Sequence, residues 1–222
     1  MIAIPDSTTY EQRTLTRHEE VSPGVFLIGV ERTHSFLPGQ SVKLGIDPAD
    51  EPRIYSICSG PDEKDLCILF NVKPGGLLTP ALAERTVGDS VWISEPFGTF
   101  LVGDEPSWMI ATGTGIAPFH ARHRMAGLPH ATLVHGARRS DQFYFEEAFT
   151  RALDKRYHRC CSREQADGLL TGRVTDFLSH RADLPTDCIY YICGQARMAV
   201  DVRDLLLAKG VPLKQIKTEI YF

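Results

Sequence analysis

The apolar runs of this chain change their rhythm near residue 100, and this change constrains the fold more than any other feature. Before it, runs of strand length are separated by turn signals such as Pro38-Gly39 and Gly88-Asp89. After it, strand-length and helix-length runs alternate. Short strands in series favour an antiparallel barrel, whereas alternating strands and helices favour a parallel sheet with helices on both faces. The sequence therefore predicts two domains, at residues 1–102 and 103–222.

The first predicted domain is a six-stranded antiparallel β-barrel with one helix. Its strands are expected at residues 11–20, 24–31, 41–46, 53–58, 66–73 and 91–95. Gly75 and Gly76 precede Thr79 and Pro80, so we expect Thr79 to cap a helix in which Pro80 is the first residue. Free N–H groups at such a start suit a pyrophosphate, but a helix that only bridges the barrel would explain the same residues.

The second predicted domain is a doubly wound α/β unit with a parallel sheet. Its five strands are expected at residues 108–111, 131–136, 157–162, 188–193 and 216–221. Its helices are expected from Pro118 to about 125 and at residues 142–153, 173–180 and 196–208. A ligand of such a sheet binds at the carboxyl ends of the strands.

Composition and charge argue against several classes of protein. No apolar run approaches the ~18 residues of a membrane span, and Met1-Ile2-Ala3-Ile4-Pro5-Asp6 is unlike a secretory leader, so we expect a cytoplasmic protein. The six cysteines follow no zinc, disulfide or iron–sulfur spacing, so we expect free thiols and no metal. Residues 1–100 carry 8 Lys/Arg and 14 Asp/Glu, and residues 101–222 carry 16 and 14, which leaves no basic stripe for nucleic acid.

The strand expected at 53–58 carries chemistry that suits a planar, phosphate-bearing ligand. Arg53 offers a bidentate clamp for an anion, Tyr55 an aromatic surface for stacking, and Ser56 a small hydrogen-bond donor. An ordinary barrel strand with a surface arginine would look the same, so these residues alone do not separate the two interpretations.

Arginines follow the ends of neighbouring strands in the second domain. Arg138 and Arg163 each follow an expected strand end, and Arg173 lies ten residues beyond Arg163. The three guanidinium groups could converge on a dianion such as the 2′-phosphate of NADP, although each alone would ordinarily be a surface arginine. The turn Gly113-Thr114-Gly115 is a further phosphate candidate that matches neither the dinucleotide fingerprint nor a P-loop.

The last two strands end in residues that could contact a flat cofactor. Cys193 and Gly194 end the fourth strand of the second domain, where a nicotinamide ring would lie, although a buried structural cysteine is the usual explanation. Tyr221 and Phe222 finish the terminal strand. Most termini fray, but a strand that is held in place could lay an aromatic ring over the cofactor.

Taken together, these residues resemble the ferredoxin–NADP(H) reductase family over nearly the whole chain, and its compact bacterial members above all. The matching segments are Phe36-Leu37-Pro38-Gly39-Gln40, Arg53-Ile54-Tyr55-Ser56, Gly76-Leu77-Leu78-Thr79, Pro96-Phe97-Gly98-Thr99-Phe100, Gly113-Thr114-Gly115-Ile116-Ala117-Pro118, Val134-His135-Gly136-Ala137-Arg138, Ser162-Arg163-Glu164, Thr171-Gly172-Arg173, Cys193-Gly194 and the aromatic terminus. Each segment is modest alone, but their order and spacing make the resemblance specific.

The resemblance implies that FAD and NADP(H) are the cofactors. The residues that it implies for FAD are Arg53, Ile54, Tyr55, Ser56, Asn71, Val72, Gly76, Leu78 and Thr79. Those that it implies for NADP(H) are Gly113, Thr114, Gly115, Arg138, Ser162, Arg163, Arg173, Cys193, Gly194 and Gln195. The implied catalytic residues are Ser56, Cys193, Glu219 and Tyr221, and either Tyr221 or the additional Phe222 would cover the flavin.

The activity that the resemblance implies is hydride transfer between NADP(H) and FAD, followed by single-electron exchange with ferredoxin or flavodoxin. The reductase component of an oxygenase, or a free-flavin reductase, would share the architecture and differ in the electron acceptor. A non-catalytic, flavin-binding regulatory subunit is the alternative from another class. Ser56, Cys193 and the three arginines argue against that alternative, because a mere binder does not need residues on the nicotinamide side.

Overall fold

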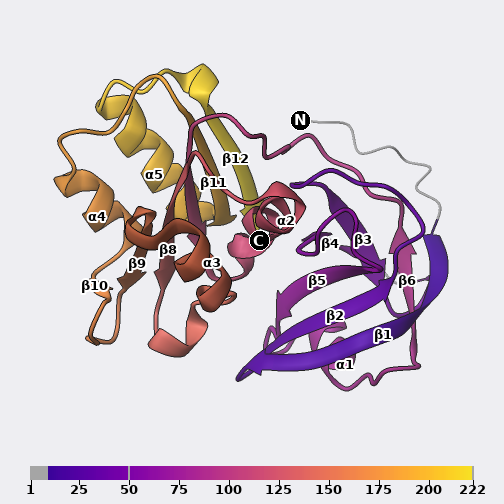
Figure 1. The fold of residues 1–222 in the computed structure, drawn as a ribbon. Coiled ribbons are helices and arrows are strands. Elements are labelled where there is room, and N and C mark those ends of the chain that lie inside the picture. Colours follow the sequence, from indigo (N-terminus) through magenta and orange to yellow (C-terminus); the bar gives the residue numbers. More distant parts are fainter. Residues whose placement is uncertain (1–9, 50, 222) are drawn as a thin grey trace.

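The structure, a computed structural model, describes residues 10–49 and 51–221 and contains two six-stranded sheets (Figure 1). The first sheet consists of β1 (Tyr10–Ser22), β2 (Val25–Glu31), β3 (Ser41–Gly45), β4 (Arg53–Ser56), β5 (Asp65–Asn71) and β6 (Ser90–Ser94). The order is β4-β3-β6-β1-β2-β5, with antiparallel pairs. Its edges approach each other where Ile57, just past β4, bridges Ile68 of β5. The antiparallel barrel is therefore confirmed.

Alternating apolar side chains point into the barrel and fill it. Ile28, Val42, Ile57 and Phe70 come from different segments of the barrel wall, and each is at most 2% exposed. Successive residues of a strand face opposite sides, so these positions bury one face and leave the other to polar residues. Leu82, on the single helix of this half, is fully buried against the same core.

That helix, α1 (Leu78–Ala83), starts earlier than the sequence predicts. Leu77 is the residue that precedes it, so the prediction that Thr79 caps the helix and Pro80 opens it is wrong. The Thr79 hydroxyl instead accepts the backbone N–H of Lys73 at 2.9 Å. This bond closes the glycine-containing loop between β5 and α1.

The second sheet is parallel throughout and has the order β10-β9-β8-β7-β11-β12. Its strands are β7 (Ser107–Thr112), β8 (Ala131–Ala137), β9 (Tyr157–Cys161), β10 (Leu170–Thr171), β11 (Ile189–Gln195) and β12 (Ile216–Tyr221). The helices α2 (Ala117–Ala126) and α3 (Glu146–Leu153) pack on one face, and α4 (Val174–His180) and α5 (Ala196–Ala208) pack on the other. The doubly wound architecture is confirmed.

Two elements of this half differ from the prediction. The helix expected from residue 142 begins at Glu146, because Phe143 and Tyr144 are buried in the core and Phe145 adopts a left-handed backbone conformation (φ 60°). The two-residue strand β10 was not expected, since so short an edge strand has no apolar periodicity.

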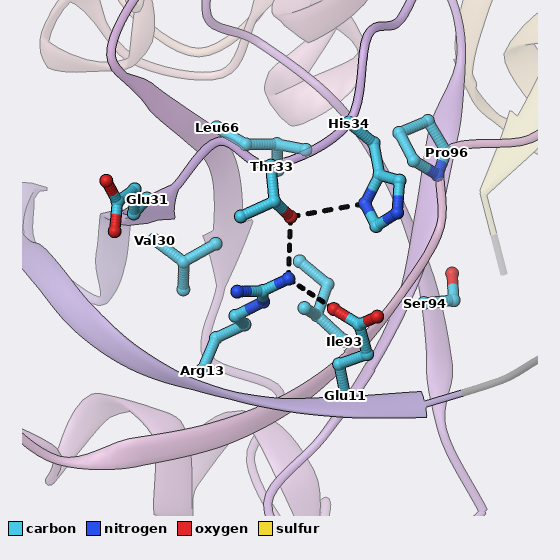
Figure 2. A pocket seen from close by; sticks show the side chains of 10 residues that line it. All are labelled: Glu11, Arg13, Val30, Glu31, Thr33, His34, Leu66, Ile93, Ser94 and Pro96. Carbon is cyan, nitrogen blue, oxygen red and sulfur yellow. Dashed lines mark hydrogen bonds and ion pairs between the residues drawn. The ribbon is translucent and has the colours of Figure 1, made fainter.

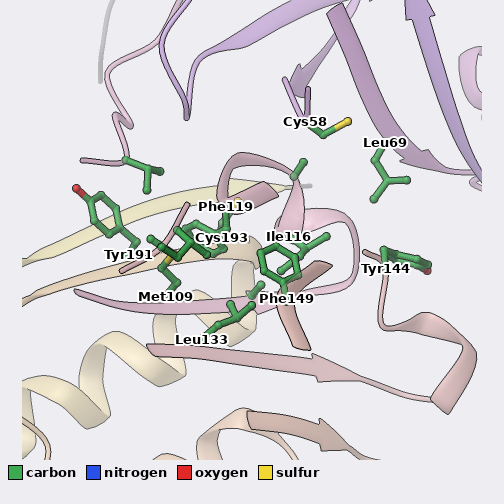
Figure 3. Packing of buried hydrophobic residues seen from close by; sticks show 14 of the residues in the cluster. Cys58, Leu69, Met109, Ile116, Phe119, Leu133, Tyr144, Phe149, Tyr191 and Cys193 are labelled. Atoms are coloured by element: carbon green, nitrogen blue, oxygen red, sulfur yellow. The ribbon is translucent and has the colours of Figure 1, made fainter. Parts of the chain in front are cut away.

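The two halves share an apolar cluster. Figure 3 shows Cys58 and Leu69 of the barrel on one side of it and Ile116 and Phe119 on the other. The fully buried guanidinium group of Arg122 also binds the connecting segment, since its Nε donates to the carbonyl of Gly103 at 2.9 Å. The division into domains at residue 102 stays a prediction.

Other expectations concern single features. All six cysteines are free thiols, as predicted. In the part of the chain that the structure describes, no helix is long and apolar enough to cross a membrane. Within the same residues, no group of three or more His, Cys, Asp or Glu side chains could hold a metal ion.

Candidate active site

Four polar side chains from both sheets meet at the junction between them. The Ser56 hydroxyl, at the end of β4, donates to Glu219 Oε2 on β12 at 2.7 Å. The Tyr221 hydroxyl donates to Ser56 Oγ, also at 2.7 Å. The thiol of Cys193, on β11, lies 3.9 Å from the same Glu219 oxygen. The fold therefore brings together the four residues for which the resemblance implied a catalytic role.

Strand register explains why these residues meet. In the parallel pair of β11 and β12, Cys193 is opposite Glu219 and Gln195 is opposite Tyr221. The carboxyl ends of both strands point towards the barrel (Figure 1). Ser56 ends β4 with its side chain only 3% exposed, so its hydroxyl must find a partner within the protein.

Burial sets the protonation of this cluster. It raises the pKa of the Glu219 carboxyl, although the hydrogen bonds from Ser56, Ser41 and Cys193 oppose the shift. It also raises the pKa of the Cys193 thiol and of the Tyr221 phenol well above their usual ranges. Tyr221 and Cys193 therefore stay protonated near neutral pH. The O–H groups form a chain from Tyr221 through Ser56 to a carboxylate, and such a chain can hold and pass a proton.

A short 3₁₀ helix (Gly113–Ile116) connects β7 to α2 and lies against the end of β11. At Gly115, a Cβ atom would lie 2.3 Å from the carbonyl oxygen of Cys193, so only glycine permits this approach. The hydroxyl of Thr112, just before this helix, is buried and has no hydrogen-bond partner among the described residues. A buried, unpaired hydroxyl next to Cys193 is the kind of group that a bound ligand satisfies.

Backbone hydrogen bonds bring the predicted arginines to one edge of the second sheet. The N–H of Ser162 donates to Ala137 and that of Arg163 donates to Arg138, at 3.0 and 3.1 Å. Arg173 lies two residues beyond the short strand β10 (Leu170–Thr171), which pairs with β9. These contacts join the loops that follow β8 and β9.

The charges of these arginines are available to a ligand. Arg138, Arg163 and Arg173 are exposed, and none forms an ion pair with another residue that the structure describes. Arg139, by contrast, is paired with both Asp141 and Glu164. Of these four arginines, Arg139 is therefore neutralised by carboxylates, and the other three are not paired with any described residue.

The predicted flavin residues line the outside of the barrel near β4. Arg53 is exposed and makes one weak ion pair with Glu51 at 3.6 Å. Tyr55 is half-buried, with its ring 6.3 Å from that of Phe70 in an edge-on contact, and burial raises the pKa of its phenol to about 12. Ile54 is 47% exposed beside them.

The remaining residues of the flavin prediction lie at the next strand end and around α1. Asn71 ends β5 and is exposed, and Val72 follows it with its N–H bonded to the carbonyl of Gly24. Gly76, Leu78 and Thr79 form the start of α1 and the loop before it. The prediction for Phe222 falls outside the described residues.

One pocket on the barrel does not belong to this site. Figure 2 shows Arg13 reaching across it to Glu11 and, at 2.7 Å, to the hydroxyl of Thr33. Its free volume is about 10 Å³, which is room for a single water molecule. It is far too small for a nucleotide.

Comparison with known proteins places this geometry in a family. A family model described as an oxidoreductase NAD-binding domain matches residues 109–204. A flavodoxin/ferredoxin–NADP reductase of Shigella flexneri is 36% identical over 157 residues, which cover 63% of this chain and 62% of that protein. A ferredoxin NADP⁺ reductase structure from Neisseria gonorrhoeae, with bound FAD and NADP, superposes with a TM-score of 0.86 at 21% identity, over 96% of this chain and 99% of that one. The chain is therefore similar in sequence to ferredoxin–NADP(H) reductases and shares their fold.

Relatives of this chain also include proteins with other names. The toluate 1,2-dioxygenase electron transfer component of Pseudomonas putida is 28% identical and covers 80% of this chain. The match spans 56% of that protein's own length, so the chain corresponds to little more than half of this relative. The chain is thus similar both to a flavodoxin/ferredoxin–NADP reductase and to an electron transfer component of a dioxygenase.

Sequence reasoning missed one residue of the site. Ser41, on β3, is opposite Ser56 in the register of β3 and β4, and its hydroxyl contacts Glu219 at 3.3 Å. It directly follows Gln40, the end of a segment that resembles the reductase family. The pairing of β3 with β4 was the missing signal, because two residues that face each other across strands share one site.

Proposed function

We propose that this protein transfers a hydride between NADP(H) and FAD and exchanges single electrons with a small carrier protein, ferredoxin or flavodoxin. The observation that carries the proposal is the meeting of Ser56, from the barrel, with Cys193, Glu219 and Tyr221, from the parallel sheet. A hydride can pass only between rings in near contact, so the reacting residues must come from the halves that hold each cofactor.

The barrel residues fit FAD. The exposed guanidinium group of Arg53 would bind the pyrophosphate, because its one ion pair within the described residues is long and solvent-exposed. Tyr55 would stack on the ring system, and the loop before α1 would complete the pyrophosphate site through its backbone N–H groups. Bound FAD supplies the conversion between a two-electron and a one-electron carrier. The protein supplies binding and orientation.

The parallel sheet fits NADP(H). The turn at Gly113 and the unpaired hydroxyl of Thr112 would face the dinucleotide next to Cys193. Arg138 and Arg163 would bind the 2′-phosphate, with Arg173 beside them. Tyr221 now occupies the position next to Ser56, so it would move aside when nicotinamide enters.

A second candidate differs only in the acceptor. The similarity to a dioxygenase electron transfer component, over 80% of this chain, supports a role as the reductase part of an oxygenase system. The described residues hold no cysteine group suited to a [2Fe–2S] centre, so within this chain the electrons would leave the flavin for another protein or domain.

Cofactor analysis followed by electron transfer tests the proposal. The purified protein should be yellow and should release FAD rather than FMN on heating, and Arg53→Ala should weaken its retention. NADPH should then support reduction of ferredoxin or flavodoxin faster than that of an oxygenase component or free flavin. A protein that binds no flavin would contradict the proposal. Faster reduction of the oxygenase component would favour the second candidate.

A further inference from the structure

The two carboxylate oxygens of Glu219 have different partners. Oε2 accepts the Ser56 hydroxyl at 2.7 Å and has the Cys193 thiol at 3.9 Å. Oε1 is contacted by the Ser41 hydroxyl at 3.3 Å. Among the residues that the structure describes, Ser41 is the one hydrogen-bond donor recorded for Oε1. A carboxylate accepts up to about four hydrogen bonds, so this oxygen depends on a single group.

Ser41 is held in place independently of the residues that must move. Its N–H and C=O both bond to the backbone of Phe97 at 2.8 Å, and β3 pairs it with Ser56 of β4. Its side chain is 2% exposed, and its hydroxyl lies 3.4 Å from that of Ser56. The hydroxyl therefore keeps its position when Tyr221, at the end of the chain, shifts to admit a ligand.

We propose that Ser41 is a positioning residue, which holds Glu219 Oε1 so that Oε2 stays directed at Ser56 and Cys193. The inference rests on the proposed function in one respect, namely that the orientation of Glu219 matters for hydride transfer. The contact itself links a barrel strand to the last strand of the parallel sheet, so it also fixes the terminal strand against the barrel. Glu219 thus binds two serines of the barrel at once.

Removal of the Ser41 hydroxyl has a defined physical consequence. A buried carboxylate oxygen without a donor loses stabilisation of its charged form, so the proton is held more tightly. The other polar groups that face Glu219 are Ser56, Cys193 and Tyr221, and no Lys, Arg or His of the described residues interacts with it. No nearby cation can therefore compensate for the loss.

The test is a titration of Glu219 by NMR in flavin-loaded protein labelled with ¹³C-glutamate, where the signal is assigned by its loss in Glu219→Gln. Ser41→Ala should raise the titration midpoint by roughly one pH unit. Ser41→Thr should leave the midpoint unchanged. Ser41→Val, whose side chain has the shape of threonine but no hydroxyl, should raise it as Ser41→Ala does. The Thr and Val variants differ only in the hydroxyl, so their comparison stands even if Ser41→Ala folds poorly.

Ser94→Ala is the matched control. Ser94 is also a buried serine of the barrel, but its hydroxyl binds the N–H of Lys43 and the carbonyl of Glu95 rather than Glu219. This variant should leave the midpoint unchanged. Equal midpoints in Ser41→Val and Ser41→Thr would overturn the inference.

The pH profile of NADPH oxidation separates this inference from the proposed function. A midpoint that shifts in Ser41→Val together with the pH profile supports both. A midpoint that shifts while the pH profile stays the same supports the role of Ser41 and contradicts the proposed use of Glu219 in turnover.

Discussion

At the residue scale, neighbouring arginines of the second sheet differ in what neutralises them. Arg139 forms ion pairs with Asp141 and Glu164, whereas Arg138 and Arg163 form none with the described residues, and a backbone hydrogen bond holds them together. Free guanidinium groups side by side attract a dianion, which a neutralised one does not. This difference provides a matched pair of variants for the choice between NADPH and NADH.

We predict that Arg163→Ala raises the KM for NADPH at least about tenfold and leaves the KM for NADH nearly unchanged, since a charge-assisted hydrogen bond contributes roughly 1.5–3 kcal/mol. Arg139→Ala should change neither. In the unmodified protein the preference for NADPH should be at least about a hundredfold and should shrink as salt rises. Steady-state kinetics with both cofactors measure this. Comparable kcat/KM values for NADPH and NADH in the unmodified protein would show that the arginines do not converge on a phosphate.

The terminal aromatic residues form a second test at this scale. Tyr221 donates a hydrogen bond to Ser56, so its ring lies at the place proposed for nicotinamide. We predict that Tyr221→Ala tightens the binding of oxidised NADP and slows turnover, because release of the nicotinamide becomes slower. Removal of Phe222 alone distinguishes the two rings. Spectroscopic titration with oxidised NADP gives the affinities, and an unchanged flavin spectrum in both variants would exclude a lid.

At the element scale, the 3₁₀ helix packs against β11 where Gly115 meets the backbone of Cys193. A methyl group at Gly115 would lie 2.3 Å from the carbonyl oxygen of Cys193, a backbone atom that cannot rotate away. Gly45, on β3, has ordinary contact distances at the same test, the nearest atom being 3.4 Å away. Comparison of alanine variants at Gly115 and Gly45 therefore distinguishes the loss of this contact from a general effect of replacing a glycine.

We predict that Gly115→Ala destabilises the protein by about 1–3 kcal/mol through overpacking, which corresponds to roughly 2–12 °C in Tm. It should also slow reduction of the bound flavin by NADPH, because the strand end next to Cys193 is displaced. Gly45→Ala should change Tm much less. Calorimetry and rapid mixing measure both effects, and equal effects of the two substitutions would contradict the prediction.

Elements with a periodic apolar pattern along their whole length were predictable from the sequence. Elements whose bounds depend on tertiary contacts were not. Helix α5 and strand β12 have the predicted bounds, 196–208 and 216–221, because a single repeat continues through each. The start of α3 was wrong, since burial of Phe143 overrides the helical pattern before Glu146. Resemblance indicated Glu219, but the contact of Ser41 with it depends on strand pairing, which no local pattern encodes.

At the scale of the whole molecule, buried histidines link stability to pH. Burial lowers the pKa of His135 to about 3 and that of His120, whose ring hydrogen-bonds the carbonyl of Cys58 across the two halves, to about 4. In the unfolded chain a histidine titrates near pH 6.5. Below that pH the unfolded chain binds more protons than the folded one, so the free energy of unfolding falls as the pH decreases from about 6.5 towards 4.

We predict that His135 alone contributes about 2 kcal/mol to the loss of stability between pH 7.5 and pH 5. His135→Gln should flatten the pH dependence by that amount, whatever it does to stability at pH 7.5. His130→Asn is the control, because His130 is exposed. Urea unfolding at both pH values gives the difference, and an unchanged pH dependence in His135→Gln would contradict the account.

Rapid anaerobic mixing with NADPH tests whether side chains from both halves form one site for hydride transfer, as we propose. Ser56→Ala should retain FAD and slow bleaching of the flavin at least about tenfold, because Ser56 lies where the two halves meet. Ser59→Ala should not slow it, since that buried hydroxyl binds, among the described residues, the backbone N–H of Cys67. NADPH deuterated at the transferred position should slow bleaching in the unmodified protein. Equal rates in Ser56→Ala and Ser59→Ala, or no bleaching of bound FAD by NADPH, would contradict the account.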